Sequence, residues 1–346
     1  DLFAFTSSEI WPVVREYERT TTTILNGYVH PRVTGYLTGL EDTLSDLGMP
    51  ARPLLTKSNG GLMRAETGKR NCVSMLLSGT AAGVTGACWL ARQAGNDRVL
   101  TLDIGGTSAD MALIIDGQPQ FGKDEKIGDY PLHIPSVSVS SIGIGGGSIA
   151  RVDAFGVLKV GPESAGSAPG PACYGRGGMH ATLTDALAVC GYLGHAPMAY
   201  GQLTLEIERA NSVVEKIALA LGRDVPATAE AIIRVAVSEM FVEVEKLASR
   251  AGIDLRDYTL MPFGGGGPML GAMLARDLGM GHILVPHRPG LVSALGGLVS
   301  DFKGDFVRAL FVSCNDSSVE ALQKASDDLI VDGNAWLYQN QGFDAA

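Results

Sequence analysis

The sequence predicts an α/β fold, and three patterns indicate it. Residues 99–104 form a short apolar run rich in β-branched side chains, which is typical of a buried strand, and a glycine turn at 105–108 follows. Residues 111–115 predict a second strand, and residues 258–261 a further one. Residues 202–250 repeat apolar side chains at helical spacing. Strands that end in glycine turns and alternate with helices define the class.

The N-terminal region predicts a helix over residues 1–48. Apolar side chains follow a spacing of three and four between positions 33 and 47, and Pro31 is placed as a first helical residue. Gly48 is expected to end this helix. Residues 54–56 then predict a short strand that leads into a polar glycine turn.

The middle of the chain carries small and flexible residues. Residues 78–80 are expected to end an apolar run, and the small residues at 81–87 predict a helix that packs closely, either at a hinge or in the core. Residues 151–153 and 156–160 predict two strands joined by a turn. Residues 161–180 are rich in Gly and Pro, so this segment is predicted to lack regular structure and to be functional.

Four further signals follow along the chain. Asp116 and Gly117 indicate a hairpin turn after the second strand. Thr184 or Asp185 is expected to cap a helix that begins at residue 186. Residues 283–286 predict a strand, and the Gly pair at 296–297 is expected to interrupt regular structure.

Composition limits the function classes. The 346 residues allow about two domains, and with 46% hydrophobic and 18% charged residues a large core is expected. The net charge of −10 argues against nucleic acid as the main partner. Five cysteines without a CxxC pair suggest a reducing compartment, and neither a spanning apolar run nor a signal peptide is recognised, so we expect a cytoplasmic protein without a membrane partner. The chain begins at Asp1 rather than Met, which suggests a piece of a longer protein.

The turn after the first strand could hold a phosphate. Gly105 and Gly106 let backbone N–H groups approach an anion, and Thr107 and Ser108 add hydroxyl donors. Asp103 at the strand end is the kind of ligand that a Mg²⁺-phosphate needs nearby. An ordinary tight hairpin explains the same residues equally well. The glycine run at 264–267, between a predicted strand and a predicted helix, is a second place where a nucleotide could lie.

Several catalytic motifs are absent from the sequence. It contains no GxxxxGK[ST] loop, no GxGxxG fingerprint, no HExxH and no GxSxG. The six histidines are dispersed, and His133, His180 and His282 are each interpreted as structural or surface residues rather than ligands.

Taken together, the motifs resemble those of the hydantoinase A/5-oxoprolinase family, whose ATP-dependent enzymes belong to the actin/sugar-kinase/Hsp70 superfamily. The resemblance runs in order through nearly the whole chain and is carried by TTTTILNGYVHP (20–31), SGTAAGVTGA (78–87), LDIGGTSAD (102–110), IGGGSIARVD (144–153), VGPESAGSAPGPACYGRGG (160–178), TLTDA (182–186), FGGGGP (263–268) and VPHRPGLVSALG (285–296).

This resemblance implies two ribonuclease-H-like lobes with ATP between them, and Mg²⁺ as the metal. Asp103, Gly105, Gly106, Thr107 and Ser108 match the family's second phosphate loop, and Gly264, Gly265, Gly266 and Gly267 match its adenosine-side loop. Asp103 is the candidate for orienting metal-bound water, and Asp185 is a second catalytic candidate whose alternative role is helix capping. Members open cyclic amides such as hydantoins or 5-oxoproline, or serve ATP-dependent carboxylation, and many pair with a hydantoinase B subunit.

The resemblance also suggests the organisation of the chain. Residues 1–98 would hold a helical segment and the remainder of the first lobe. Residues 99–310 would form the second lobe, with a Gly/Pro-rich insertion at 143–180 and a helical insertion at 202–250. Residues 311–346 would be a C-terminal segment.

Three departures from the family pattern bear on function. The first phosphate loop, similar to DxGGTxxD, is missing, so we expect an incomplete first lobe and weak or no turnover by these residues alone. Ser138 and Ser140 stand where many relatives carry Asp and His, which leaves their role open, and Gly266 and Leu270 depart from the GGAGPLH of many relatives. The sequence favours a cyclic-amide hydrolase. An ATP-dependent ketone carboxylase subunit or a non-catalytic partner-binding remnant remains an alternative.

Overall fold

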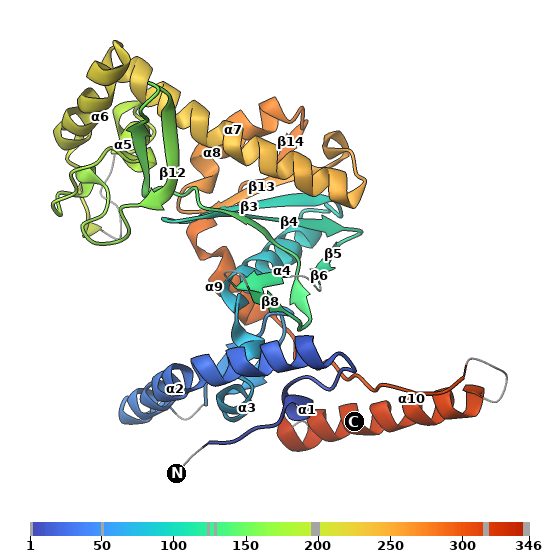
Figure 1. Cartoon of the computed structure of the whole chain (residues 1–346). Coiled ribbons are helices and arrows are strands. Elements are labelled where there is room, and N and C mark those ends of the chain that lie inside the picture. The colour runs from blue at the N-terminus through green and yellow to red at the C-terminus, as the bar shows by residue number, and fades with distance from the viewer. Residues whose placement is uncertain are drawn as a thin grey trace. The chain divides into compact units, whose positions relative to one another are not determined.

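The computed structural model describes residues 3–49, 52–122, 125–127, 130–194, 201–313 and 318–341 (Figure 1). Helices and strands alternate along these ranges, which confirms the α/β class. The helices are α1 (Ser7–Ile10), α2 (Glu16–Asp46), α3 (Ala65–Arg70), α4 (Ser78–Gln93), α5 (Leu183–Val189), α6 (Ile207–Leu221), α7 (Val225–Ala251), α8 (Gly267–Asp277), α9 (Val292–Val299) and α10 (Ser318–Ala335). The strands are β1 (Leu54–Thr56), β2 (Leu62–Arg64), β3 (Val99–Ile104), β4 (Ala109–Ile115), β5 (Gln118–Pro119), β6 (Phe121–Gly122), β7 (Glu125–Ile127), β8 (Tyr130–Leu132), β9 (Ser136–Val137), β10 (Ser140–Ile142), β11 (Ser148–Val152), β12 (Leu158–Ser164), β13 (Thr259–Gly264) and β14 (His282–Ile283).

The described residues also include short 3₁₀ turns and one π turn. The 3₁₀ turns are Cys72–Met75, Ala172–Tyr174, Leu255–Asp257 and Pro289–Leu291, and a π turn follows α10 at Trp336–Asn340. No described helix is both long enough and apolar enough to cross a bilayer.

The chain divides into two compact units. Unit 1 comprises Asp1–Trp89, Pro119–Ser138 and Ser293–Ala346, and unit 2 comprises Leu90–Gln118 and Val139–Val292.

Unit 2 is built on one sheet with the strand order β10-β4-β3-β13-β14. The first three strands in sequence, β3, β4 and β10, pair antiparallel, whereas β13 pairs parallel with β3 and β14 parallel with β13. Numbered along the chain, this is a 3-2-1-4-5 sheet with strands 1, 4 and 5 parallel. The arrangement confirms the ribonuclease-H-like lobe that the sequence implied.

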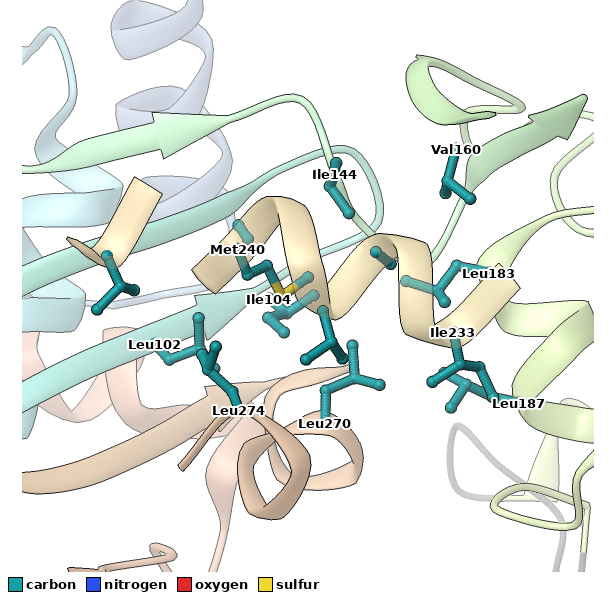
Figure 2. Packing of buried hydrophobic residues seen from close by; sticks show 14 of the residues in the cluster. Leu102, Ile104, Ile144, Val160, Leu183, Leu187, Ile233, Met240, Leu270 and Leu274 are labelled. Atoms are coloured by element: carbon teal, nitrogen blue, oxygen red, sulfur yellow. The ribbon is translucent and has the colours of Figure 1, made fainter. Parts of the chain in front are cut away.

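The core of unit 2 lies between this sheet and its helices. Helix α8 packs on β13 and β3, and α7 packs on α8. Figure 2 shows Leu102 and Ile104 of β3 near Leu270 and Leu274 of α8, with Met240 of α7 close by. All five side chains are fully buried. Burying side chains of this size stabilises the sheet by about 2 kcal/mol each, and it fixes the C-terminal end of β3 in place.

The hairpin that follows the sheet corrects one prediction. Strands β11 and β12 pair antiparallel as expected, but β12 continues to Ser164, inside the segment predicted to lack regular structure. A 3₁₀ turn at Ala172–Tyr174 adds further order. Arg151 Nη1 of β11 donates a hydrogen bond to the Gly161 carbonyl of β12 (2.9 Å) and ties the two strands together.

Unit 1 carries only two-stranded sheets within its described residues, β1-β2, β6-β9 and β7-β8. Helix α2 passes through Pro31, so the expectation that this proline begins a helix is wrong. The preceding turn is held by tertiary contacts. Asn26 is fully buried, its Nδ2 donates to the Arg70 carbonyl (3.1 Å) and its Oδ1 accepts from Val73 N (2.9 Å). These bonds anchor the helix to residues 70 and 73 just before the position where the proline removes a helix hydrogen bond.

Small residues make a close helix contact in unit 1. Helix α4 begins at Ser78, so residues 78–80 start a helix rather than end a run. Gly296 and Gly297 lie inside α9 and do not interrupt it, contrary to expectation. A Cβ on Gly296 would lie 1.8 Å from the Ala82 carbonyl oxygen, so the two helices meet at backbone distance there. The glycine is therefore explained by packing rather than by a turn.

Candidate functional site

Four glycine-rich turns of unit 2 line one cavity of about 590 Å³. This volume lies within the usual range of small-molecule sites. The turns are separated by long stretches of sequence: the β3–β4 turn, the turn before β11, the loop after β12 and the β13–α8 turn. They contribute Gly105, Gly106, Thr107, Gly146, Gly147, Gly166, Ser167, Gly265 and Gly266.

Hydrogen bonds hold the turns against each other. Gly146 N donates to the Gly105 carbonyl (2.9 Å), and Gly147 N donates to the Gly106 carbonyl (2.7 Å). The Thr184 hydroxyl donates to the Gly146 carbonyl (2.7 Å). Gly266 N donates to the Ile104 carbonyl (2.9 Å). The cavity is thus framed by backbone bonds between segments that the sheet brings together.

Close backbone approach explains why glycine stands at Gly145. A Cβ there would lie 2.6 Å from Thr107 N and 2.7 Å from Ser108 N, closer than real Cβ atoms come to backbone. Gly145 N is held by a hydrogen bond to the Ser148 Oγ (2.9 Å). A side chain at this position would push the β3–β4 turn away.

The β3–β4 turn offers backbone donors. Gly105 N donates to the Ser108 carbonyl (3.0 Å) and closes the turn. Within the described part of the chain, the N–H groups of Gly106, Thr107 and Ser108 donate no hydrogen bond. Successive amides of this kind form a concave site that suits an anion such as phosphate.

Part of the cavity wall is apolar. It is formed by Leu183 and Leu187 of α5 and by Met269 and Leu270 of α8, together with Leu193. The glycine turns and this apolar side give the cavity donors for an anion and a surface for a flat apolar group.

Asp103 lies beside the cavity, in β3, and is not one of the residues that line it. A Cβ on Gly264, which has a φ of +77°, would lie 2.2 Å from Asp103 Oδ1, so the β13–α8 turn passes directly over the carboxylate. Burial, and then the nearby charge of Asp110, raises the pKa of Asp103 to about 6. A bound cation would favour the charged form that this environment disfavours.

Asp110 is a site residue that the sequence reasoning did not single out. It pairs directly with Asp103 across the β3–β4 ladder. Burial raises its pKa, while a hydrogen bond from Ser141 acts in the opposite direction. No ion pair to either carboxylate occurs within the described residues. The sequence could have indicated Asp110, because residues that face each other across two paired strands lie on the same side of the sheet.

Asp185 has a structural place. It is fully buried at the third position of α5, where it completes a capping box with Thr182. Its carboxylate accepts hydrogen bonds from Cys173 N (2.8 Å), Ala172 N (3.3 Å), Thr182 N (3.0 Å) and Thr182 Oγ1 (2.7 Å). Asp185 does cap the helix as expected, although the helix begins at residue 183 and Thr182 is its N-cap.

The structure places the predicted residues in two groups. Gly105, Gly106, Thr107, Gly265 and Gly266 line the cavity together. Ser108, Gly264 and Gly267 belong to the same turns without lining it, and Asp103 and Asp185 lie outside its wall. The turns at 146–147 and 166–167 complete the cavity and were recognised in the sequence only as family motifs.

Ser140, one of the positions where the chain departs from its family's pattern, lies in β10. Its hydroxyl donates to Glu243 of α7, and this hydrogen bond is the main reason why the pKa of Glu243 is lowered. Arg250 Nη2 donates to the same hydroxyl (3.3 Å). Ser140 therefore ties the edge strand of the sheet to α7. Within the described residues, no group of three or more His, Cys, Asp or Glu side chains could together hold a metal ion.

Comparison with known protein families gives a clear match. The model of the hydantoinase/oxoprolinase family matches residues 19–305. Among curated relatives, the alpha subunit of caprolactamase from Pseudomonas jessenii is 35% identical over 93% of this chain. The 5-oxoprolinase 1 of Arabidopsis thaliana is 30% identical over 85% of it. The chain spans 47% of the first relative's length and 24% of the second's.

Solved structures agree with these sequence matches. The structure of ATP-dependent caprolactamase from Pseudomonas jessenii superposes with a TM-score of 0.80 at 33% identity, covering 98% of this chain and 49% of that one. The nucleotide-free structure of acetone carboxylase superposes with a TM-score of 0.83 at 27% identity, covering 99% of this chain and 49% of that one. The fold of this chain is therefore shared with both kinds of enzyme.

Proposed function

Because the chain belongs to the hydantoinase/oxoprolinase family, we propose that it supplies the nucleotide site of an enzyme that uses ATP to open a cyclic amide. The observation that carries this proposal is the cavity on which four glycine turns converge. Two relatives with solved structures, caprolactamase and acetone carboxylase, are described as ATP-dependent, and each is named for a substrate that carries a carbonyl group.

The residues present fit ATP. The N–H groups of Gly106 and Thr107, which line the cavity and donate no hydrogen bond within the described residues, would bind phosphate oxygens, and the glycines around them leave room for close approach. The apolar side formed by α5 and α8 would hold the adenine base. Asp103, with Asp110 beside it, would hold Mg²⁺ together with phosphate oxygens, since Mg²⁺ usually binds through one or two carboxylates plus substrate phosphates. Bound there, the ion would neutralise charge that develops on the transferring phosphoryl group.

The chemistry explains why a cyclic amide needs ATP. A lactam carbonyl is a poor electrophile, and phosphorylation of its oxygen supplies a leaving group before water attacks. The backbone donors of the β3–β4 turn would stabilise the charge on the phosphoryl group, and Asp103 would orient metal-bound water. Asp185 is committed to the cap of α5, so we assign the catalytic role to Asp103 and a structural one to Asp185.

Sequence identity gives the hydrolase only a small margin over the carboxylases. Identity to the caprolactamase alpha subunit is 35%, against 33% to the acetophenone carboxylase gamma subunit of Aromatoleum aromaticum and 28% to the acetone carboxylase beta subunit of Xanthobacter autotrophicus. The slightly higher TM-score of acetone carboxylase keeps the carboxylase as the second candidate. Relatives of both kinds are subunits by name, which supports a partner subunit of the hydantoinase B type. We place the protein in the cytoplasm, because its five cysteines are scattered and form no CxxC pair in the sequence.

The test is substrate-dependent ATP hydrolysis by the natural polypeptide that contains this sequence, with and without its partner subunit. Stimulation by ε-caprolactam, 5-oxoproline or a hydantoin without bicarbonate is the expected result. Stimulation only by a ketone together with bicarbonate would assign the carboxylase reaction instead. Absence of nucleotide binding and of any stimulation would leave a non-catalytic, partner-binding protein. The 346 residues alone are expected to turn over ATP weakly, because they carry one of the family's two phosphate loops.

A further inference from the structure

Unit 1 contains two adjoining cavities that the nucleotide cavity does not use. The larger has a volume of about 650 Å³ and the smaller about 290 Å³. Both are lined by Trp11, Ile134, Pro135, Asp305 and Val307, so they share a wall. Together they form a site with two chemically different ends.

The smaller cavity is the polar end. Asn59 is 3% exposed, and its Nδ2 donates to Asp305 Oδ2 (2.6 Å) while its Oδ1 accepts from Gly61 N (2.9 Å). Lys57 Nζ donates to the Lys303 carbonyl (2.7 Å), which leaves it two further N–H donors. Burial lowers the pKa of Lys57, and the charge of Asp305 opposes that effect. A half-buried ammonium with unused donors is a ready partner for a carbonyl oxygen.

The same cavity holds an unused acceptor. Asn71 lines it, and Asn71 Oδ1 is buried yet accepts no hydrogen bond within the described part of the chain. A buried acceptor without a partner costs about 1–3 kcal/mol, and native proteins rarely leave one unsatisfied. A ligand with an N–H group would satisfy it.

The larger cavity is the apolar end. Val13, Val14, Phe121 and Val307 contribute to its wall, and the area it exposes is mainly apolar. Such a surface suits methylene groups, whose transfer from water is favourable by about 0.8 kcal/mol each.

We propose that the two adjoining cavities bind the cyclic amide, with its amide edge at Lys57 and Asn71 and its methylene ring against Val307. Lys57 donates to the ring carbonyl oxygen, and Asn71 Oδ1 accepts from the ring N–H. This inference rests on the proposed function and adds to it the place and orientation of the substrate. A ketone has no N–H group, so it would leave Asn71 Oδ1 unpaired, and the pocket favours a lactam over a ketone.

A size change at the apolar end provides the first test. In Val307→Trp the indole would fill the larger cavity. Val307 is 39% exposed, so the change leaves the core of unit 1 intact. Val312→Trp is the matched control, because Val312 is 48% exposed and lies outside both cavities. ε-Caprolactam is the probe, and its dissociation constant is measured by calorimetry or ligand-detected NMR in the absence of ATP. We expect at least a tenfold weaker Kd for Val307→Trp and a change below twofold for Val312→Trp.

A change in the ligand tests the polar end without altering the fold. N-methylcaprolactam lacks the N–H group and is expected to bind the unmodified protein about tenfold more weakly than caprolactam. In Asn71→Ala this difference should disappear. Equal binding of the two lactams by the unmodified protein, an unchanged Kd in Val307→Trp, or no lactam binding at all would each overturn the site. Because these assays need no ATP, lactam binding without stimulated turnover would contradict the proposed function and leave the pocket standing.

Discussion

Asp103 and Asp110 face each other directly across the β3–β4 ladder, one residue before and one after the pair formed by Ile104 and Ala109. Two carboxylates opposite one another on a sheet repel, and both are partly buried. Burial raises the pKa of each, and the described residues provide no cation that would compensate. The repulsion between the two carboxylates therefore destabilises the free protein next to the β3–β4 turn. A bound divalent cation would offset this repulsion.

Asp103→Asn is expected to stabilise the free protein and to abolish its ATP turnover. Because the folded-state pKa of Asp103 is raised to about 6, the stability linked to its protonated form is fully present below about pH 4 and is lost as the pH rises through 6. The variant should therefore unfold with a free energy about 1–2 kcal/mol higher than the parent above pH 7, after allowance for partial exposure, and with an equal one near pH 4. Denaturant titrations at the two pH values measure the difference.

Asp116→Asn serves as the control for this prediction. Asp116 is exposed in the turn after β4 with a φ of +53°, a conformation that Asn also accepts. Its substitution should change stability by less than about 0.5 kcal/mol at either pH. A pH-independent effect of Asp103→Asn would contradict the environment assigned to that carboxylate.

Gly145→Ala is expected to destabilise unit 2 and to weaken nucleotide binding. The new Cβ would clash with Thr107 N and Ser108 N. These are backbone atoms, so the clash can be relieved only if the β3–β4 turn moves. We expect a loss of about 1–3 kcal/mol and a nucleotide Kd at least tenfold weaker. Gly281→Ala, where the Cβ meets nothing, should be neutral. Thermal unfolding and titration with an ATP analogue provide the two readouts, and normal binding by Gly145→Ala would argue against a nucleotide at this turn.

The sequence was sufficient where structure is local. The strand, turn and strand over residues 99–115 follow from two short apolar runs separated by two glycines, and Asp116 and Gly117 both adopt positive φ as a two-residue hairpin turn requires. The helical spacing over 202–250 was equally legible, although the structure divides this range into α6 and α7; Ile232, Ala236 and Met240 of α7 are fully buried on one face.

Contacts between distant segments could not be predicted in the same way. The bond from Gly146 N to the Gly105 carbonyl joins residues that only the folded sheet brings together, so the cavity turns at 146–147 and 166–167 were not assigned as site residues. Pro31 was misplaced for a related reason. The helix turn before it is anchored by contacts that Asn26 makes with residues 70 and 73, and these lie outside any local pattern.

Asp185→Asn should destabilise unit 2 without a direct effect on chemistry. The carboxylate accepts four hydrogen bonds in a fully buried place, and an amide would turn one N–H group toward a donor. The expected loss is about 2–4 kcal/mol. Asp224→Asn is the matched control, because Asp224 is an exposed N-cap at α7 and Asn caps equally well. If Asp185→Asn lost ATP turnover at full stability, Asp185 would have to be moved from the structural to the catalytic residues.

Cys173 is expected to resist alkylation in the native protein. Its thiol is fully buried, and burial followed by the charge of Asp185 raises its pKa far above the ordinary value, so almost no thiolate forms at neutral pH. Cys190 is only partly buried, although burial raises its pKa as well, and it should react before Cys173. Mass spectrometry after iodoacetamide treatment distinguishes the two sites, with the unfolded protein as the control in which both react.

The Asp185→Asn variant should make Cys173 more reactive. Cys173 N donates a hydrogen bond to Asp185, so loss of the carboxylate should loosen the loop, and labelling of Cys173 should rise with the fraction of molecules in which the loop is open. Rapid labelling of Cys173 in the folded parent protein would show that this loop opens on its own and that the cap of α5 does not hold it.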